Sequence, residues 1–549
     1  MSDAPASPTT GHPHGLYVLF FAEMWERFCY YGMRTLLVLY LTKELLFADE
    51  PAYGIYGAYT ALVYAAPVIG GKMADNLLGY RRAVVMGGIL MALGEFLLVG
   101  NGLTPNNTLL FVGMGLIIVG NGYFKANISS IVGKLYVPGD PRRDSGFTIF
   151  YMGINIGALL ATTVCGFVGE TYGYNYGFGL AGIGMLVGIG VFLFGQDKLQ
   201  GLGGAPDEAK LHAAWKGPLS RWHVTVLASL GVVPILYWLL QNEQIVNWLL
   251  GATMIAVCFS LLSGAIAAGK LAPAAERTVQ RDRIIALFVL MFFNTLFWAL
   301  FEQAGTSLTL FADRAVDRQI DLLAWEMPTS NTQAFNPAFI IIFGSVFSWM
   351  WVRLDKAGLN PNIPMKFALG TIQLGCGFLL LLVGASMATD YKVALIFLVL
   401  MYMLHTTGEL FVSPIGLSMV TKLAPAHLTG TVMGAWFLSF AFANKLGALL
   451  AKLTGSAPSL MGAITKLIEA AKAGWVEPPK LPVNLSDAFA RTLERAAAGW
   501  PEAAAAEGAK EVFDTYIGTY QLFGFVIVGV GVFLLVASGW LNKMMHGVK

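Results

Sequence analysis

Apolar runs long enough to cross a bilayer recur along this chain from residue 15 to residue 541. The bilayer core offers no water to backbone N–H and C=O groups, so runs of about 20 apolar residues fold as helices that pair these groups internally. Charged residues make up only 12% of the 549 positions, against about 25% in soluble domains. We therefore expect an all-α polytopic protein embedded in a lipid bilayer. The expected spans are 15–41, 54–74, 83–101, 107–126, 146–167, 174–195, 222–240, 246–268, 283–312, 334–354, 365–387, 392–422, 428–453 and 514–541.

These spans form a pattern of six, two and six, which predicts 14 transmembrane helices. We expect the chain to be organised as two six-helix bundles with two extra helices inserted between them. The predicted domains are a cytoplasmic tail (1–14), an N-terminal bundle (15–195), a cytoplasmic linker with the two extra helices (196–282) and a C-terminal bundle (283–549), which contains an extracytoplasmic insertion at about 455–511.

Basic residues lie mainly in alternate loops, such as Arg81 and Arg82 in one loop and Arg142 and Arg143 in the next loop but one. Cytoplasmic loops of membrane proteins carry an excess of Lys and Arg, so both termini are predicted to be cytoplasmic. Residues 1–14 contain no Lys or Arg, which predicts that the first span is an uncleaved signal. The net charge is +2 and no basic cluster occurs, so we expect no nucleic-acid partner.

The first expected span contains four charged side chains: Glu23, Glu26, Arg27 and Arg34. Each such charge costs about 2.5–3.5 kcal/mol at the centre of a membrane helix, so it needs a partner or a water-filled path. Glu23 and Arg27 stand at i and i+4 and can neutralise each other. A structural ion pair that fixes the helix is one interpretation. Because Glu26 and Arg34 go beyond a single pair, we favour a functional role for the group.

The loop between the second and third spans reads Gly70-Gly-Lys-Met-Ala-Asp75-Asn-Leu-Leu-Gly-Tyr-Arg81-Arg82. This loop resembles the cytoplasmic loop motif of the major facilitator superfamily, as does the arrangement of two six-helix halves. The resemblance implies a substrate site at the membrane midplane between the halves. It also implies a conformational gate loop, in which Gly70 allows helices to approach closely and Asp75, Arg81 and Arg82 bind neighbouring helix ends in one conformation. A chance turn with mixed charges is the alternative.

Further motifs narrow the resemblance to one family within this superfamily. The first span contains Glu23-x-x-Glu26-Arg27-Phe28-x-Tyr30-Tyr31-Gly32, the fourth Phe124-Lys125, and the fifth Phe150-Tyr151-Met-Gly-Ile-Asn155. The second half contains Phe297-Trp298-x-x-Phe301-Glu302-Gln303, Asn336-Pro337 and Gly408-Glu409. Together these motifs resemble the proton-coupled oligopeptide transporter family, over about residues 15 to 450. The two extra helices are similar to those of its prokaryotic members, which implies a plasma membrane location, the bacterial inner membrane.

The chemistry of these residues agrees with that resemblance. A short peptide carries an ammonium at one end and a carboxylate at the other, and its side chains vary. The first half supplies buried cations and the second half supplies anions, which suits a zwitterion because charges attract strongly away from water. Asn155 and Asn336 add amide donors and acceptors, and the aromatic residues add pocket walls, although plain helix packing is an equal alternative for each aromatic residue. The predicted peptide-binding residues are Arg34, Lys125, Tyr30, Tyr31, Tyr64, Asn155, Asn336, Glu409, Trp298 and Trp436.

The resemblance further implies symport of protons with di- and tripeptides by alternating access, by a protein that acts as a monomer. The predicted proton-coupling residues are Glu23, Glu26, Arg27, Glu302 and Arg34. We expect Arg34 and Lys125 to attract the peptide carboxylate, Glu409 and Asn336 to take the amine, and Asn155 the backbone. Opening of a Glu302–Arg34 pair is expected to link gating to proton binding, because a carboxylate away from cations favours its neutral form.

Other functions fit the sequence less well. An enzyme needs a nucleophile with its base or a metal cluster, and no such spacing occurs, so we expect neither enzymatic activity nor a metal or cofactor. A channel usually has a repeated filter or a ring of like charges. The main alternative is a major facilitator carrier for another small solute, such as nitrate, a small organic anion or a drug. Glu409 disfavours an anion carrier, because such a carrier has no use for a carboxylate that faces its ligand.

Three other polar residues in the expected spans have no assigned role. His405 lies one turn before Glu409, where either a proton relay or a neutral, hydrogen-bonded side chain is open, the latter being more usual. Glu95 and Lys445 are expected to lie near helix ends, with their charged heads reaching towards water.

Overall fold

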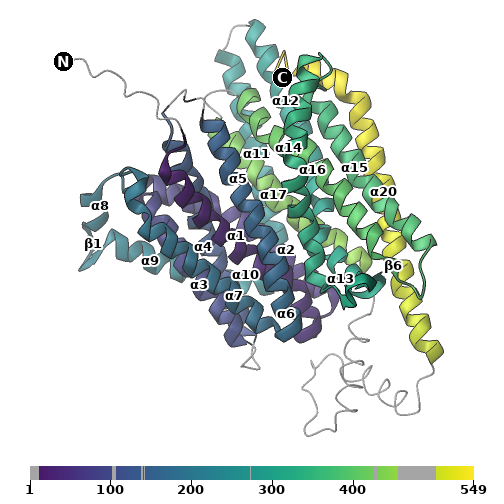
Figure 1. Ribbon diagram of the computed structural model, residues 1–549. Helices are drawn as coiled ribbons and strands as arrows, with labels where there is room; N and C mark the ends of the chain where they lie inside the picture. The colour runs from purple at the N-terminus through teal and green to yellow at the C-terminus, as the bar shows by residue number, and fades with distance from the viewer. Residues whose placement is uncertain are drawn as a thin grey trace.

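The structure is a computed structural model that describes residues 11–101, 107–137, 140, 142–271, 274–424, 429–455 and 502–548. Helices run side by side in two groups, and the described chain begins and ends on the same side of the molecule (Figure 1). We call this the terminal side and the opposite one the distal side.

The N-terminal bundle contains six spans, and the fifth is divided by a π-turn. Its elements are α1 (His14–Leu39), η1 (Tyr40–Glu44), α2 (Asp49–Met73), η2 (Ala74–Leu78), α3 (Tyr80–Asn101), α4 (Thr108–Lys134), α5 (Arg143–Leu160), η3 (Ala161–Cys165), α6 (Gly166–Tyr172) and α7 (Tyr174–Phe194). Helix α1 packs against α5 and α7, and α4 packs against α2 and α3.

The linker contains a short β-hairpin followed by two inserted spans. Pro234 lies in the first turn of α10, where proline is tolerated, just after the break between α9 and α10 within the first inserted span. We call α9, α10 and α11 together the inserted hairpin. The elements are η4 (Gln196–Leu199), α8 (Glu208–His212), β1 (Ala214–Lys216), β2 (Leu219–Ser220), α9 (Arg221–Gly231), α10 (Val233–Gln241) and α11 (Glu243–Leu271).

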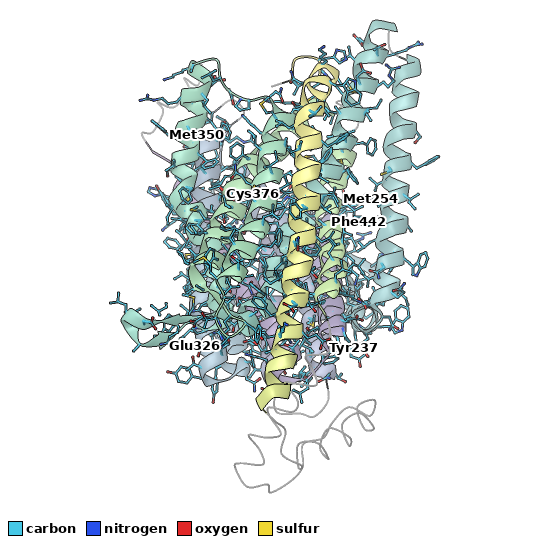
Figure 2. The ribbon with its side chains drawn as sticks, turned by 90° about the vertical axis from the view of Figure 1, so that its right-hand side faces the viewer. Tyr237, Met254, Glu326, Met350, Cys376 and Phe442 are labelled. Atoms are coloured by element: carbon cyan, nitrogen blue, oxygen red, sulfur yellow. The ribbon has the colours of Figure 1, made fainter. Side chains whose placement is uncertain are left out.

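The C-terminal bundle begins with a long helix and ends with α20, which lies along α15 on the outside of the bundle (Figure 2). Its helices are α12 (Ala274–Phe301), η5 (Glu302–Gly305), α13 (Ser307–Ala315), η6 (Asp321–Leu323), η7 (Thr329–Ala334), α14 (Phe335–Lys356), α15 (Ile363–Ser386), α16 (Leu395–Leu423), α17 (Thr429–Ala451), η9 (Lys452–Thr454) and α20 (Glu502–Met544). Its short strands are β3 (Val316–Asp317), parallel to β6 (Val393–Ala394), and β4 (Gln319–Ile320), antiparallel to β5 (Trp325–Glu326).

The predicted helical membrane fold is confirmed. Within the described residues, 13 helices are long and apolar enough to cross a membrane. Helix α1 is not among them because every 18-residue stretch of it contains three charged residues, Glu23, Glu26 and Arg27, which is too many for an apolar span. At 26 residues it is nevertheless long enough to span, and it completes the predicted 14.

Three helices, α4, α12 and α20, have boundaries more than a few residues from those expected. Helix α4 ends at Lys134 rather than near 126, and the expected span 283–312 is interrupted after Phe301 by η5. Helix α12 begins at Ala274 rather than near 283, and α20 begins at Glu502 rather than near 514. The α20 extension is rich in Ala and Glu, which favour helix even outside the bilayer, and the α12 extension (274–282) is mostly polar and charged. Most of the predicted insertion at 455–511 lies outside the described residues, as does most of the predicted tail at 1–14.

The two bundles are in close contact on the distal side and separate towards the terminal side. A Cβ placed on Gly57 of α2 would lie 2.3 Å from that of Ala448 of α17, so these helices meet almost backbone to backbone. Further along α2, Val68 is 55% exposed and Ile69 is 69% exposed. The space between the bundles is therefore closed at its distal end.

Candidate functional site

A cavity of about 330 Å³ lies between the two bundles. Its walls come from α1, α2, α4 and α5 on one side and from α12, α14, α16 and α17 on the other. Most residues singled out from the sequence line it: Glu23, Arg27, Tyr31, Arg34, Tyr64, Lys125, Asn155, Trp298, Glu302, Asn336 and Glu409. Three of the predicted residues, Glu26, Tyr30 and Trp436, are buried behind this wall.

A larger cavity, of about 610 Å³, lies between α3 and α9, and its lining is mostly apolar. The buried charges of both bundles converge on the smaller cavity instead, so we take the smaller cavity as the site.

On α1, Arg27 lies between two carboxylates. Its Nε is 3.1 Å from Glu23 Oε1 and 2.5 Å from Glu26 Oε2. Asn121 of α4 donates a hydrogen bond of 2.9 Å to the other oxygen of Glu26. Two carboxylates and one guanidinium form a group with one negative charge in excess when all three are ionised. Such a group has room for a proton without leaving its cation unpaired.

Further along α1, Arg34 joins the two bundles. Its Nη2 contacts Glu302 Oε2 directly, and its Nε donates to Tyr56 Oη at 2.6 Å. Glu302 stands where α12 ends and the chain continues as the 3₁₀ turn η5. The side chains of Arg34 and Glu302 are only 9% and 8% exposed. The structure therefore places the predicted gating pair in contact across the bundle interface.

Lys125 of α4 has a different environment. Its Nζ lies 4.2 Å from the centroid of the Tyr64 ring, in a cation–π contact. The Tyr64 ring stacks on Phe440 of the opposite bundle, with the centroids 6.2 Å apart. Within the described part of the chain, no carboxylate forms an ion pair with Lys125, so its charge is available to an anionic group in the cavity.

Glu409 of α16 faces the cavity from the opposite bundle. Asn336 of α14 donates through Nδ2 to Glu409 Oε2 at 2.9 Å and to Thr406 Oγ1 at 3.1 Å. Among the described residues, no Lys or Arg forms an ion pair with Glu409. The amide thus holds the carboxylate in place and leaves it free to accept a hydrogen bond from a cationic ligand.

Asn155 reaches the cavity because two glycines set the position of α5. A Cβ on Gly157 would lie 2.2 Å from the Met24 carbonyl oxygen, and one on Gly153 would lie 2.9 Å from the Phe20 ring. These glycines therefore permit the close packing of α5 on α1. Asn155 Nδ2 donates to the Tyr151 carbonyl at 3.0 Å.

The sequence analysis did not single out several cavity residues as site residues. Helical spacing could have identified two of them, Tyr151 and Phe440. Tyr151 precedes the predicted site residue Asn155 by one helical turn, and Phe440 follows the predicted site residue Trp436 by one turn. The remaining omissions include Ser129, Thr162, Phe301, Gln333, Tyr402, Ser413 and Phe437.

Charged contacts close the distal side of the cavity, and these were also not predicted. Lys43 lies 2.5 Å from Asp313, and Arg314 binds both oxygens of Asp49 at 2.6 and 2.9 Å. Glu170 accepts hydrogen bonds from the backbone N–H groups that begin η7, at 3.1 and 2.6 Å. Each contact joins one bundle to the other.

The residues of the predicted gate loop lie on the terminal side. A Cβ on Gly70 would lie 2.1 Å from the Gly122 carbonyl oxygen, so Gly70 permits the close approach of α2 to α4. Asp75 accepts a hydrogen bond from Tyr80 at 2.8 Å. Arg81 donates to the Leu202 carbonyl at 2.5 Å.

Arg82, the last residue of that loop, donates to Glu208 at 2.8 Å and holds the pKa of this exposed carboxyl below its usual value. The two arginines thus bind the segment that follows α7. The hydrogen-bond partner of Asp75, Tyr80, is the first residue of α3.

The three residues without an assigned role are all buried. Glu95 is 0% exposed and accepts a weak hydrogen bond from the Cys29 thiol at 3.6 Å. Lys445 is also buried, so the expectation that these two charged heads reach towards water was wrong. His405 packs against Phe378, with ring centroids 4.7 Å apart, and does not line the cavity.

Comparison with known proteins identifies the family. A model of the POT family matches residues 81–467. The chain belongs to the POT family. Dipeptide and tripeptide permease B of Salmonella typhimurium is 32% identical to this POT-family chain over 538 residues, covering 97% of this chain and 96% of the permease. The peptide transporter YePEPT of Yersinia enterocolitica is 36% identical over 459 residues, covering 81% of this chain and 88% of that transporter.

Solved structures resemble this POT-family protein along nearly its whole length. The crystal structure of peptide transporter POT in complex with sulfate superimposes with a TM-score of 0.73 at 33% identity, covering 99% of this chain and 98% of that one. A mutant of peptide transporter POT in complex with alafosfalin has the same score and coverage. The POT family is a transporter family, so the protein is a multi-pass membrane transporter.

Proposed function

We propose that this POT-family protein is a proton-coupled symporter that imports di- and tripeptides by alternating access. One observation carries the proposal: among the described residues, the same cavity has a cation without an ion-pair partner on one bundle and a carboxylate without one on the other. Lys125 lies on the N-terminal wall and Glu409 on the C-terminal wall. The names of the permease and the transporter that the chain resembles support the same substrate class.

In the proposed binding mode, the peptide lies across the cavity between the bundles. Its carboxylate is bound by Lys125 and Arg34, and its ammonium donates to Glu409, which Asn336 orients. Asn155 serves the peptide backbone. Aromatic side chains such as Trp298 and Phe440 form walls that contact different side chains without polar selection.

In the proposed coupling step, a proton on Glu302 releases Arg34. While both are charged, the guanidinium is occupied by the carboxylate and the bundles are held together at this point. Neutralising Glu302 removes that attraction, so Arg34 becomes free for the peptide carboxylate. Glu23 and Glu26 with Arg27 form a second group whose net charge a proton alters.

The conformation fits one end-point of this cycle. The distal contacts are closed and the cavity faces the terminal side, which we assign to the cytoplasm because Arg81, Arg82, Arg142 and Arg143 lie there. We therefore propose an inward-facing state, in the inner membrane of a bacterium, with both termini cytoplasmic. The cavity is complete within one chain, in agreement with a functional monomer.

A carrier for nitrate, a small organic anion or a drug is the alternative. The test is uptake of a fluorescent dipeptide by cells that make the protein, in competition with unlabelled dipeptides, tripeptides, single amino acids and nitrate. We expect di- and tripeptides to compete and amino acids and nitrate to have little effect. Competition by nitrate alone would contradict the proposal.

A further inference from the structure

The inserted hairpin contacts both bundles. Its first arm lies on the N-terminal bundle, where Ser229 and Tyr123 of α4 share a hydrogen bond of 2.8 Å and the Tyr237 ring meets Phe111 at 6.0 Å. Its second arm, α11, packs against α12 and α17 of the C-terminal bundle. Figure 2 shows this arm at the edge of the molecule, with Met254 on it and Tyr237 towards the distal side. The turn between the arms therefore lies where the bundles meet.

Glu243 is the first residue of α11, at this turn, and it binds Lys445 of α17 and Lys452 of η9. Its Oε2 is 3.0 Å from Lys445 Nζ and its Oε1 is 2.6 Å from Lys452 Nζ. Lys445 also donates to the Gly54 carbonyl of α2 at 3.3 Å. The Lys445 side chain is only 4% exposed, so its ammonium depends on these two partners rather than on water. One buried cation thus joins the hairpin, α2 and α17.

Gly54 provides the space for the carboxylate. The three atoms nearest to a Cβ built on Gly54 all belong to Glu243, at 2.2, 2.4 and 2.7 Å. Any side chain at this position would displace the carboxylate from its lysines. Just along α2, Gly57 meets Ala448 of α17, so the carboxylate lies beside the closest contact between the bundles.

We infer that the inserted hairpin is a third part of the distal gate and that Glu243 is its positioning residue. The inference rests on the proposed alternating access, in which α2 and α17 must separate on the distal side. That separation breaks the Lys445–Gly54 contact and pulls Lys445 and Lys452 away from a hairpin whose first arm stays on α4. The Glu243 contacts therefore stabilise the conformation in which the distal side is closed. This stabilisation comes from the inserted hairpin and adds to the contacts between the two bundles.

The test measures the conformational equilibrium directly. Spin labels replace Tyr176 at the distal end of α7 and Met387 after α15, both on the distal side and 66% and 69% exposed, with the four native cysteines replaced. Double electron–electron resonance in nanodiscs then gives the ratio of long (distal-open) to short (distal-closed) distances. We expect Glu243→Gln, which weakens the ion pairs with both lysines, to raise this ratio at least about threefold, because even one exposed ion pair contributes on that scale.

Matched controls distinguish a specific stabilisation of the closed distal side from a general structural effect of the substitution. Glu326→Gln removes a carboxylate that pairs with Arg318 within one bundle, and we expect it to leave the distance ratio unchanged. Gly54→Ala is expected to raise the ratio as Glu243→Gln does. In a Glu243→Ala background the same Gly54→Ala change should have no further effect, because the atoms that its methyl group meets are gone.

Equal ratios in the parent and in Glu243→Gln would overturn the inference. Full additivity of Gly54→Ala with Glu243→Ala would also overturn it, because the two changes would then act separately. The distances do not depend on which solute is carried, so these outcomes are distinct from a failure of the proposed peptide transport.

Discussion

Replacing Glu409 by Gln tests the proposed recognition of the peptide ammonium. Gln has nearly the same shape and keeps a carbonyl oxygen for the Asn336 amide, which now donates to Glu409 at 2.9 Å. The change therefore removes the charge and little else. Glu409 is only 7% exposed, and no cation of the described residues forms an ion pair with it, so a peptide ammonium is its proposed ionic partner.

The size of the effect follows from this environment. A hydrogen bond to a charged group contributes about 1.5–3 kcal/mol. At 1.4 kcal/mol per tenfold change, we expect Glu409→Gln to weaken a zwitterionic dipeptide by roughly 10- to 140-fold. An N-acetylated dipeptide has no ammonium to lose, so we expect it to weaken less than about threefold.

The assay is competition by each peptide against labelled dipeptide exchange in proteoliposomes, for the parent and the variant. Glu95→Gln is the matched control because Glu95 is buried in the N-terminal bundle and does not line the cavity. We expect it to leave the ratio of the two affinities unchanged. Equal losses for the free and the acetylated peptide in Glu409→Gln would refute the assignment of Glu409 to the ammonium.

Three further predictions follow from the contacts of the cavity and its gate. Glu302→Gln imitates the protonated carboxyl, so it should retain peptide exchange and lose accumulation driven by a pH gradient; accumulation equal to that of the parent would move the coupling site elsewhere. Gly157→Ala places a methyl group against the Met24 carbonyl, so we expect a melting temperature lower by several degrees, measured in detergent; an unchanged melting temperature would show that α5 can move aside at no cost. Asp49→Asn weakens the paired hydrogen bonds from Arg314, and we expect a cysteine in the cavity to react several-fold faster with an impermeant reagent applied from the distal side; an equal rate would exclude this pair from the gate.

The arrangement of spans could be predicted from the sequence because membrane insertion depends on local apolar length. The helices were expected within a few residues, except that α4, α12 and α20 extend further along the chain than the apolar runs from which they were predicted. Charge in an apolar run was an equally strong signal for the cavity. Glu23, Arg34, Lys125 and Glu409 all face it.

Apart from the Arg34–Glu302 pair, which the family resemblance implied, contacts between distant segments could not be predicted from the sequence. Trp436 and Tyr30 belong to the right helices but are packed behind the cavity wall, because the rotation of a helix about its axis depends on its neighbours. Lys445 was expected to reach water, and only the fold reveals Glu243 of the inserted hairpin as its partner. Burial without such a partner would be costly, which is why hydropathy alone suggested the helix end.

The central claim is that this protein couples proton entry to peptide accumulation. The most direct measurement is uptake of a labelled dipeptide into proteoliposomes with an acidic exterior and equal peptide concentrations on both sides. We predict net accumulation of the dipeptide inside the proteoliposomes. This accumulation disappears when a proton ionophore collapses the gradient, and it is absent in Glu302→Gln. Peptide concentrations that stay equal while the pH gradient is intact would contradict proton coupling. Accumulation that the ionophore does not affect would also contradict it.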